Sequence, residues 1–231
     1  MPSGDRKKKS RASDPFRYDR AVLDGVEGLE SHGACDLRLA GADEAGRGCL
    51  AGPLVVAAVV LDYSRAPFPL LAGLTDSKLM TLGAREAIYG GILASVSRVT
   101  WTAFSPASID SRGLHRSNLA GLARVLEALG GEYRLAIVDG FDLKRPDLRA
   151  RALVGADYKS AAVAAASVVA KVVRDRIMRA LAPAYPDYGF EEHVGYGTGA
   201  HREALRTLGP CALHRLSFQG VETPQLELWS E

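Results

Sequence analysis

The chain has 231 residues, of which 47% are hydrophobic, enough for one domain with a buried core. Its formal net charge is only +2, and five basic residues lie among the first twelve, so the remainder carries a slight negative charge. Three widely separated cysteines argue against a disulfide framework or a CxxC zinc knuckle, and no apolar run is long enough to span a membrane. The basic N-terminus lacks the apolar segment of a signal peptide, so we expect a cytoplasmic protein.

The first part of the chain is expected to contain a leader, a short helix and two strands. Residues 1–13 are rich in Lys, Arg, Ser and Gly, which predicts disorder, either as a solvated tail or as an arm that contacts nucleic acid. A short helix is expected around residues 18–29. Strands are predicted over 37–42, an apolar segment, and over 54–62, a β-branched run.

Helices and strands alternate in the rest of the chain. Hydrophobic periodicity predicts helices over 84–96, 115–129 and 158–181, and strands over 98–104 and 135–138. The last helix is rich in alanine and valine, so we expect it to lie close against a sheet. This order of elements predicts an α/β fold with a mixed sheet.

The most informative segment is residues 41–48, which read Gly-Ala-Asp-Glu-Ala-Gly-Arg-Gly. Asp43 and Glu44 are carboxylates of the kind that bind hard cations such as Mg²⁺ or Mn²⁺. Gly46 and Gly48 leave the main chain open to a bulky partner, and the guanidinium of Arg47 suits phosphate. Metal ligands beside a phosphate-accessible backbone indicate phosphoryl chemistry.

This segment allows two other interpretations. It could be a polar turn after a strand, or a dinucleotide-binding loop, since Gly46, Gly48 and Gly52 nearly fit G-x-G-x-x-G. The glycine spacing is one residue too long for that loop, and residues 54–61 resemble a strand where the motif requires a helix. Two carboxylates would also repel a pyrophosphate.

Two more acids stand at the ends of predicted elements. Asp139 closes the strand over 135–138, although an Asp-Gly turn is the alternative that this residue favours when taken alone. Asp157 precedes the long helix, where an N-cap is the alternative. With Asp43 and Glu44 they form four acids that could converge at one edge of a sheet. A site for phosphoryl transfer with two divalent ions requires several carboxylates.

Motifs along the chain resemble those of ribonuclease HII, the type 2 ribonuclease H family. The resemblance covers residues 37–220, and it begins with residues 41–54 (GADEAGRGCLAGPL). The further matching segments are TDSK at 75–78, VDG at 138–140, ADYKS at 156–160, AAASVVAK at 164–171, RDR at 174–176, GYGT at 195–198, His201 and LHRLSF at 213–218.

The resemblance implies an RNase H-like fold, in which a mixed central sheet is flanked by helices and followed by a small C-terminal helical region. It also implies an endoribonuclease that hydrolyses the RNA strand of RNA/DNA hybrids and nicks 5′ to a single ribonucleotide embedded in duplex DNA, the first step of ribonucleotide removal. The implied domains are a basic leader over 1–36, a catalytic domain over 37–220 and a flexible tail over 221–231.

The resemblance also assigns roles to individual residues. The catalytic, metal-binding acids for Mg²⁺ or Mn²⁺ would be Asp43, Glu44, Asp139 and Asp157. Gly46, Arg47 and Gly48 match the loop that reads the 2′-hydroxyl and grips the adjacent phosphate, and Tyr196 matches a tyrosine that packs on the sugar at the RNA-to-DNA junction. Contacts to the nucleic-acid backbone are expected from Lys78, Lys159 and Lys171.

Four of the five histidines, His115, His193, His201 and His214, have no metal-ligand spacing, and His214 is expected to be a structural hydrogen-bonding residue. The sister family, ribonuclease HIII, fits less well because it lacks the Arg-Gly found here at residues 47–48. Two other functions stay open: a structure-specific DNA resolvase, and a catalytically silent module that binds hybrids.

The C-terminal segment Gln225-Leu226-Glu227-Leu228-Trp229 resembles the short peptide by which bacterial proteins bind the sliding clamp. An ordinary disordered terminus is the alternative. Nothing in the sequence demands more than a monomer.

Overall fold

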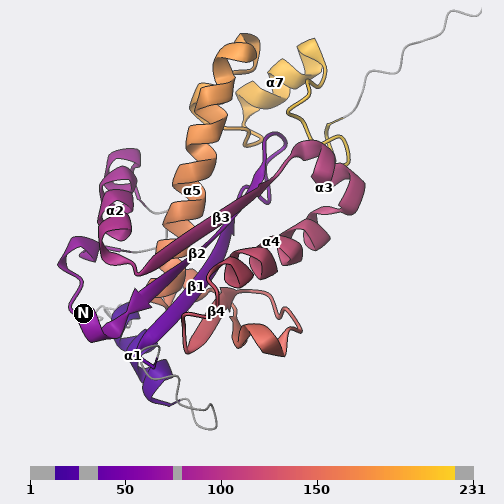
Figure 1. Cartoon of the computed structure of the whole chain (residues 1–231). Coiled ribbons are helices and arrows are strands. Elements are labelled where there is room, and N and C mark those ends of the chain that lie inside the picture. Colours follow the sequence, from indigo (N-terminus) through magenta and orange to yellow (C-terminus); the bar gives the residue numbers. More distant parts are fainter. Residues whose placement is uncertain (1–13, 26–35, 75–79, 222–231) are drawn as a thin grey trace, which may run out of the picture.

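A computed structural model of the chain describes residues 14–25, 36–74 and 80–221 (Figure 1). Within these residues, five strands form one sheet in the order β3–β2–β1–β4–β5. The strands are β1 (Arg38–Ala45), β2 (Leu54–Asp62), β3 (Arg98–Phe104), β4 (Leu135–Asp139) and β5 (Ala150–Leu153). The helices are α1 (Pro15–Asp24), α2 (Leu82–Ser95), α3 (Pro106–Arg112), α4 (Leu114–Ala128), α5 (Ala161–Leu181), α6 (Phe190–His193) and α7 (Gly199–Leu208).

The sheet is mixed, as the sequence predicts. Strand β1 pairs antiparallel with β2 and parallel with β4, while β3 and β5 form the two edges. Every residue of β2 is buried, because helices cover both faces of the sheet at this strand. Residues 54–61 of this strand therefore form an unbroken apolar run rather than an alternating pattern.

Helices pack on both faces of the sheet (Figure 1). Because side chains alternate along a strand, Leu39 and Val59 face the core around α5, whereas Ala40 and Val60 face the core around α4. Helices α1 and α2 pack in turn against α5. The two cores enclose the central strands and hold their carboxyl ends in place.

Helix α5 lies unusually close to β1. A Cβ atom added at Gly41 would fall 2.1 Å from the carbonyl carbon of Ala162 and 2.3 Å from the amide nitrogen of Val163, so only glycine fits there. The facing part of α5 is a run of buried alanines and valines, which permits this approach. The close contact fixes which residues of α5 reach the carboxyl end of β1.

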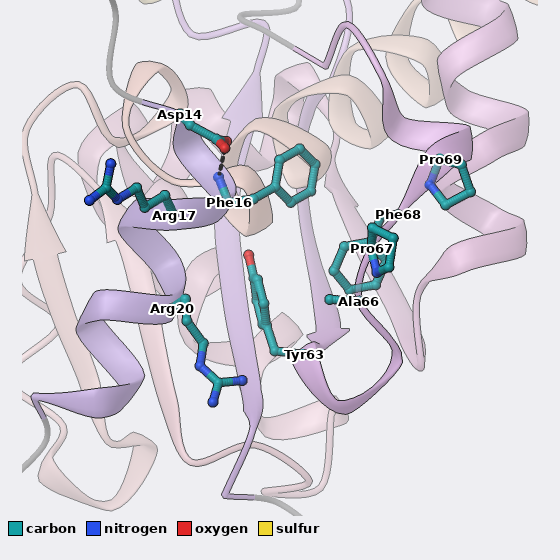
Figure 2. Close-up of a pocket in the computed structure, with 9 residues that line it drawn as sticks. All are labelled: Asp14, Phe16, Arg17, Arg20, Tyr63, Ala66, Pro67, Phe68 and Pro69. Atoms are coloured by element: carbon teal, nitrogen blue, oxygen red, sulfur yellow. Dashed lines mark hydrogen bonds between the residues drawn. The ribbon is translucent and has the colours of Figure 1, made fainter.

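Helix α1 is attached to the start of α5 by a buried carboxylate. Asp19 accepts hydrogen bonds from the Tyr63 hydroxyl at 2.7 Å and from the Ala162 amide at 2.9 Å. Burial raises the pKa of Asp19 to about 6, although these hydrogen bonds lower it in part. Between α1 and the loop after β2 lies a pocket of about 690 Å³, in which Phe16 and Phe68 stack (Figure 2).

Several predicted boundaries are confirmed and others are wrong. The strands over 54–62 and 98–104 agree with β2 and β3 at both ends. Strand β1 runs three residues beyond the predicted end at Ala42, because its ladder with β2 continues through the pair Ala45–Val55. The short helix predicted around 18–29 lies earlier, at Pro15–Asp24, where Asp14 caps it by accepting a hydrogen bond from the Phe16 amide.

No helix in the described part of the chain has both the length and the apolarity to cross a membrane. The basic leader over residues 1–13 and the clamp-like segment Gln225–Trp229 lie outside the described residues. The division into a leader, a catalytic domain and a tail therefore stays a prediction.

We expect Gly41→Ala to lower the free energy of unfolding by about 3 kcal/mol or more, because the added methyl group must push backbone against backbone. Chemical denaturation measures this change. The control is Gly90→Ala on exposed α2, where a Cβ meets nothing within 4 Å; it should be neutral or raise the free energy of unfolding by about 0.5–1 kcal/mol. Equal effects of the two substitutions would contradict the close contact.

Candidate functional site

The parallel pair β1 and β4 brings two of the predicted acids to the same edge of the sheet. The register pairs Ala42 with Val138, and the next residue on each strand is Asp43 or Asp139. Parallel strands end on the same side, so these carboxylates become neighbours although they are far apart in sequence. Glu44 follows within β1, which means that the acidic pair lies inside the strand rather than in a turn after it.

The carboxylates repel one another. Asp43 is only 4% exposed, and burial together with the charges of Glu44 and Asp139 holds its pKa well above the usual range. Two hydrogen bonds oppose this shift: the Glu44 amide donates to Asp43 Oδ1 at 2.7 Å, and the Ser167 hydroxyl on α5 also contacts this carboxylate. A cation between these acids would relieve the repulsion, so the donor set fits a hard divalent ion.

Asp157 is connected to Asp139 through the main chain. The amide of Ala156 donates to Asp139 Oδ1 at 2.7 Å, which holds the 3₁₀ turn Ala156–Tyr158 beside the end of β4. The N-cap interpretation of Asp157 is wrong, because α5 begins only at Ala161 and its cap is Ser160, which accepts from Val163. The side chain of Asp157 is buried, 4% exposed.

A cavity of about 190 Å³ lies at this edge of the sheet. Three of the four predicted acids line it, together with the loop after β1 and residues of α5. Its lining residues are Asp43, Glu44, Ala45, Gly46, Arg47, Gly48, Asp139, Ser167, Lys171 and Tyr196. Asp157 is not among them, and within the described residues no group of three or more Asp, Glu, His or Cys side chains is arranged to hold a metal ion. The four-ligand metal site therefore stays a prediction.

The glycine loop, residues 46–53, forms one wall of the cavity. Gly46 has φ +94°, and a Cβ there would fall 2.1 Å from Arg174 Nε, so a side chain is excluded on two grounds. A methyl group at Gly48 would meet nothing within 4 Å, which leaves this part of the loop open to a partner. The guanidinium of Arg47 lies 3.6 Å from Glu44 Oε1 and 4.7 Å from the centre of the Phe141 ring.

Two completely buried arginines hold the glycine loop from beneath. Arg174 on α5 donates to the carbonyls of Pro53 at 3.0 Å, Ala51 at 2.9 Å and Val194 at 2.9 Å. Arg215 donates to Gly52 at 3.0 Å and to Arg47 at 3.1 Å. Because these carbonyls are engaged, the loop backbone is fixed.

Sequence reasoning noted both arginines within motifs but gave them no role. A signal was present for Arg174: Ser167, Lys171, Arg174 and Met178 recur at intervals of three and four residues, and so share one face of α5. For Arg215 the sequence offers no such periodicity.

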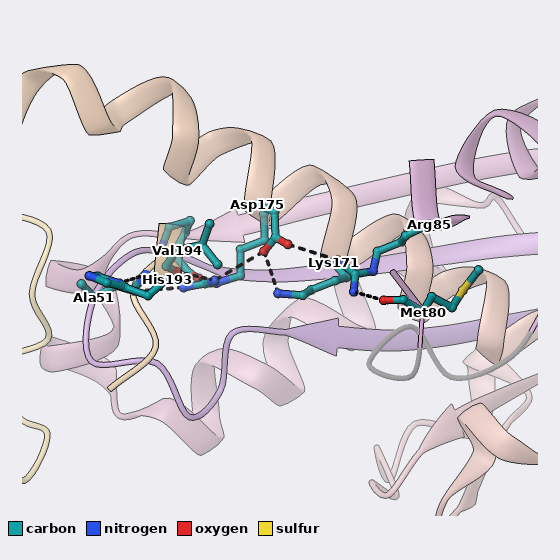
Figure 3. Close-up of polar contacts among 10 residues, drawn as sticks. Ala51, Met80, Arg85, Lys171, Asp175, His193 and Val194 are labelled. Carbon is teal, nitrogen blue, oxygen red and sulfur yellow. Dashed lines mark hydrogen bonds and ion pairs between the residues drawn. The ribbon is translucent and has the colours of Figure 1, made fainter. Parts of the chain in front are cut away.

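Lys171 places a positive charge in the cavity, opposite the acids. Its ammonium binds Asp175 Oδ1 at 2.8 Å, and Asp175 is within 3.5 Å of Arg85 Nη1 on α2 (Figure 3). Arg85 in turn donates to the carbonyl of Met80 at 2.9 Å. Burial lowers the pKa of Lys171.

The other predicted lysines are placed differently. Lys78 lies outside the described residues. Lys159 is exposed, and its ammonium donates to the carbonyl of Val154 at 2.9 Å.

Tyr196 lies at the mouth of the cavity. The residue is 37% exposed, and the Lys171 ammonium lies 4.7 Å from the centre of its ring. Its hydroxyl forms a hydrogen bond with the thiol of buried Cys49 in the glycine loop, and burial raises its pKa. The aromatic ring, the glycine loop and the acids therefore line one cavity.

The family model described as Ribonuclease HII matches residues 40–221. A Ribonuclease HII of Azorhizobium caulinodans is 44% identical over 221 residues, which cover 96% of this chain and 80% of that protein. A Ribonuclease HII of Parafrankia sp. is 45% identical over 206 residues, covering 89% of this chain and 81% of that protein.

Solved structures give the same result for the fold. The ribonuclease H2 of Pyrococcus horikoshii matches with a TM-score of 0.68 and 28% identity, over 80% of this chain and 95% of that one. The RNase HII in a complex with PCNA from Archaeoglobus fulgidus matches with a TM-score of 0.68 and 30% identity, over 79% of this chain and 96% of that one. The predicted RNase H-like fold is thereby confirmed. A Bst-RNase HIII solved with Mn²⁺, 22% identical with a TM-score of 0.60, shares this fold.

We expect Arg174→Lys to lower the free energy of unfolding by roughly 2–4 kcal/mol, because an ammonium cannot reach three carbonyls that a guanidinium fork serves together. Arg176→Lys is the matched control, since Arg176 is exposed on the same helix and contacts the carboxylate of Glu86 and the ring of Tyr89 but no carbonyl of the glycine loop. Thermal and chemical unfolding measure both. A loss no larger for Arg174 than for Arg176 would show that the loop is held by other contacts.

Proposed function

Because the chain belongs to the ribonuclease HII family and is therefore a ribonuclease H, we propose that it hydrolyses the RNA strand of RNA/DNA hybrids and nicks duplex DNA 5′ to a single embedded ribonucleotide. The observation that carries this proposal is the cavity in which acids of β1 and β4 face the glycine loop and Tyr196. In the cell this activity would begin the removal of ribonucleotides from DNA. We propose that the chain acts as a cytoplasmic monomer.

The proposed catalytic residues are Asp43, Glu44, Asp139 and Asp157, which would hold Mg²⁺ or Mn²⁺. Bound there, the divalent ions would supply an activated water and stabilise the leaving 3′-oxygen, giving 5′-phosphate and 3′-hydroxyl ends. The repulsion that raises the pKa of Asp43 supports this assignment, because it is the electrostatic state that a cation relieves. The Mn²⁺ complex of an RNase HIII with the same fold also supports it.

Selectivity for a ribonucleotide would come from the glycine loop and Tyr196. The 2′-hydroxyl is the one group that distinguishes RNA from DNA at a single nucleotide, and open backbone at Gly46–Gly48 can approach it closely. Arg47 would grip the adjacent phosphate. The ring of Tyr196 would pack on the next sugar and favour deoxyribose, since a further 2′-hydroxyl would clash with it.

Positive charge for the nucleic-acid backbone would come from single residues rather than from the bulk of the protein. Lys171 stands in the cavity, and Lys78 and Lys159 are further candidates for phosphate contacts. The basic leader would add an arm whose contribution depends on salt concentration.

The proposed activity is tested on two labelled duplexes that differ by one 2′-hydroxyl. Wild-type protein with Mg²⁺ or Mn²⁺ should nick only the duplex with the ribonucleotide, on its 5′ side, and a chelator should abolish the nick. Asp43→Asn should reduce turnover on the order of 1,000-fold or more and leave duplex affinity largely intact. Asp147→Asn, at an exposed acid that does not line the cavity, is the matched control and should cut normally.

Each alternative function predicts a different result. Equal nicking of the all-DNA duplex would indicate a DNA resolvase. Tight binding of hybrids without any cleavage, in wild type as in Asp43→Asn, would indicate a silent binding module. Either result would overturn the proposal.

We also propose that the segment Gln225–Trp229 binds a sliding clamp. The support is its resemblance to clamp-binding peptides and the archaeal RNase HII that was solved in complex with PCNA. Spaced apolar side chains of an extended segment would fill a pocket on the clamp.

Titration of the full chain with a purified bacterial sliding clamp tests this. Binding should be lost when Leu228 and Trp229 are both replaced by alanine, while cleavage of the ribonucleotide duplex is unchanged. Absence of binding by the wild-type chain at high micromolar clamp would retire the idea.

A further inference from the structure

Helix α7 and its histidine contribute nothing to the proposed chemistry, yet they hold the main chain at Tyr196. The carbonyl of Tyr196 is 2.9 Å from His201 Nδ1, and its amide donates to the carbonyl of His193 at 2.9 Å. The next residue of α7, Arg202, donates to the carbonyl of Gly197 at 3.2 Å. The Tyr196 carbonyl also accepts from the Thr198 amide at 2.8 Å, so the main chain is held before and after Tyr196.

His201 is completely buried and is bonded to a second buried histidine, 13 residues further along the chain. The Nε2 atoms of His201 and His214 lie 3.0 Å apart, and His214 Nδ1 lies 2.9 Å from the Cys211 amide. We call His201 and His214 the histidine pair. The earlier expectation that His214 is a structural hydrogen-bonding residue is confirmed by these contacts.

The chemistry of these contacts allows one arrangement of protons. The Cys211 amide donates to His214 Nδ1, so this nitrogen carries no proton. The proton of the neutral His214 ring is therefore on Nε2. That N–H points at His201 Nε2, which must therefore accept. A carbonyl only accepts, so His201 carries its proton on Nδ1, towards Tyr196. Both rings are neutral, and each has a fixed tautomer.

An additional proton has no place in this arrangement. On His201 Nε2 it would oppose the N–H of His214, and on His214 Nδ1 it would oppose the Cys211 amide. The surroundings also disfavour charge: the ring of His193 stacks on His201 at 4.3 Å, Tyr188 and Phe190 pack around the pair, and the cationic Arg202 acts on His201. Burial lowers the pKa of His201 to about 4, although the hydrogen bond to the Tyr196 carbonyl raises it in part, and burial also lowers the pKa of His214.

We propose that the histidine pair positions Tyr196 and thereby sets the selectivity of the enzyme for deoxyribose on the 3′ side of the ribonucleotide. This inference rests on the proposed function of Tyr196. His201 and His214 touch neither substrate nor the reacting atoms; they are positioning residues that act through the Tyr196 carbonyl. The pair holds the ring where its face meets the Lys171 ammonium at 4.7 Å and the Arg174 guanidinium at 5.5 Å, and where its hydroxyl meets the Cys49 thiol.

Two nearly isosteric variants of His201 each keep one of its two side-chain hydrogen bonds, to the Tyr196 carbonyl or to His214. In His201→Asn the amide nitrogen takes the place of Nδ1 and can still donate to the Tyr196 carbonyl. In His201→Gln the amide takes the place of Nε2 and keeps only the bond to His214. Glu203→Gln is the matched control, because Glu203 is exposed on the same helix and pairs with Arg206.

The readout is the ratio of kcat/KM for a duplex with one ribonucleotide to that for a duplex with a second ribonucleotide directly 3′ of it. His201→Asn and Glu203→Gln should keep the wild-type ratio within about twofold, and His201→Gln should lower it by about tenfold. A ratio unchanged in His201→Gln, or lowered equally in His201→Asn, would overturn the inference while leaving the proposed function intact. A wild-type enzyme that cuts both duplexes equally would overturn the role of Tyr196 and this inference with it.

The tautomers provide a second test that needs no activity and no further variant. In ¹H–¹⁵N spectra of the wild-type protein near pH 7, His201 should be the Nδ1–H tautomer, the less common form of free histidine, and His214 the Nε2–H tautomer. Neither ring should titrate near the ordinary pKa of about 6.5. An Nε2–H tautomer for His201, or titration near that value, would contradict the proposed arrangement even if His201→Gln failed to fold.

Discussion

The close contact between α5 and β1 is the constraint on which the rest of the site depends. Gly41 gives the helix room to approach until backbone meets backbone, and the small side chains of α5 keep it there. From that point the helix runs along β1, so successive turns present Ser167 to Asp43, Lys171 to the cavity and Arg174 to the glycine loop. A wider separation would move all three together.

The site combines charges of both signs at short range. Acids from β1 and β4 line the cavity together with Lys171. The cationic Arg174 and Arg215 are buried behind the glycine loop. The two arginines are too deeply buried to bind substrate; their guanidinium groups are used on loop carbonyls. Their positive field nevertheless extends into the loop that is proposed to grip a phosphate. The two arginines thus both fix the backbone of the glycine loop and supply positive charge beside it.

The local sequence pattern predicts the boundaries of some elements correctly and of others incorrectly. Strands β2 and β3 were predicted to the residue because β-branched runs end at clear breaks, whereas the ladder with β2 extended β1 through the acids. The α5 start was predicted too early, since a 3₁₀ turn and the Ser160 cap cannot be distinguished from helix by periodicity. The four acids are predicted from their positions at the ends of elements, and the family motifs assign their roles. The contact between His201 and His214 and the role of Arg215 are not predicted, because their partners are set by tertiary contacts between distant segments.

The central claim is that acids from separate elements hold divalent ions against the scissile phosphate. Crystals of the protein soaked in Mn²⁺ test it most directly through the anomalous signal of the metal. The account predicts manganese bound to Asp43 together with Asp139, within the cavity that Tyr196 borders. Manganese bound only elsewhere, or no ion at Asp43 in a protein that cleaves hybrids, would contradict it.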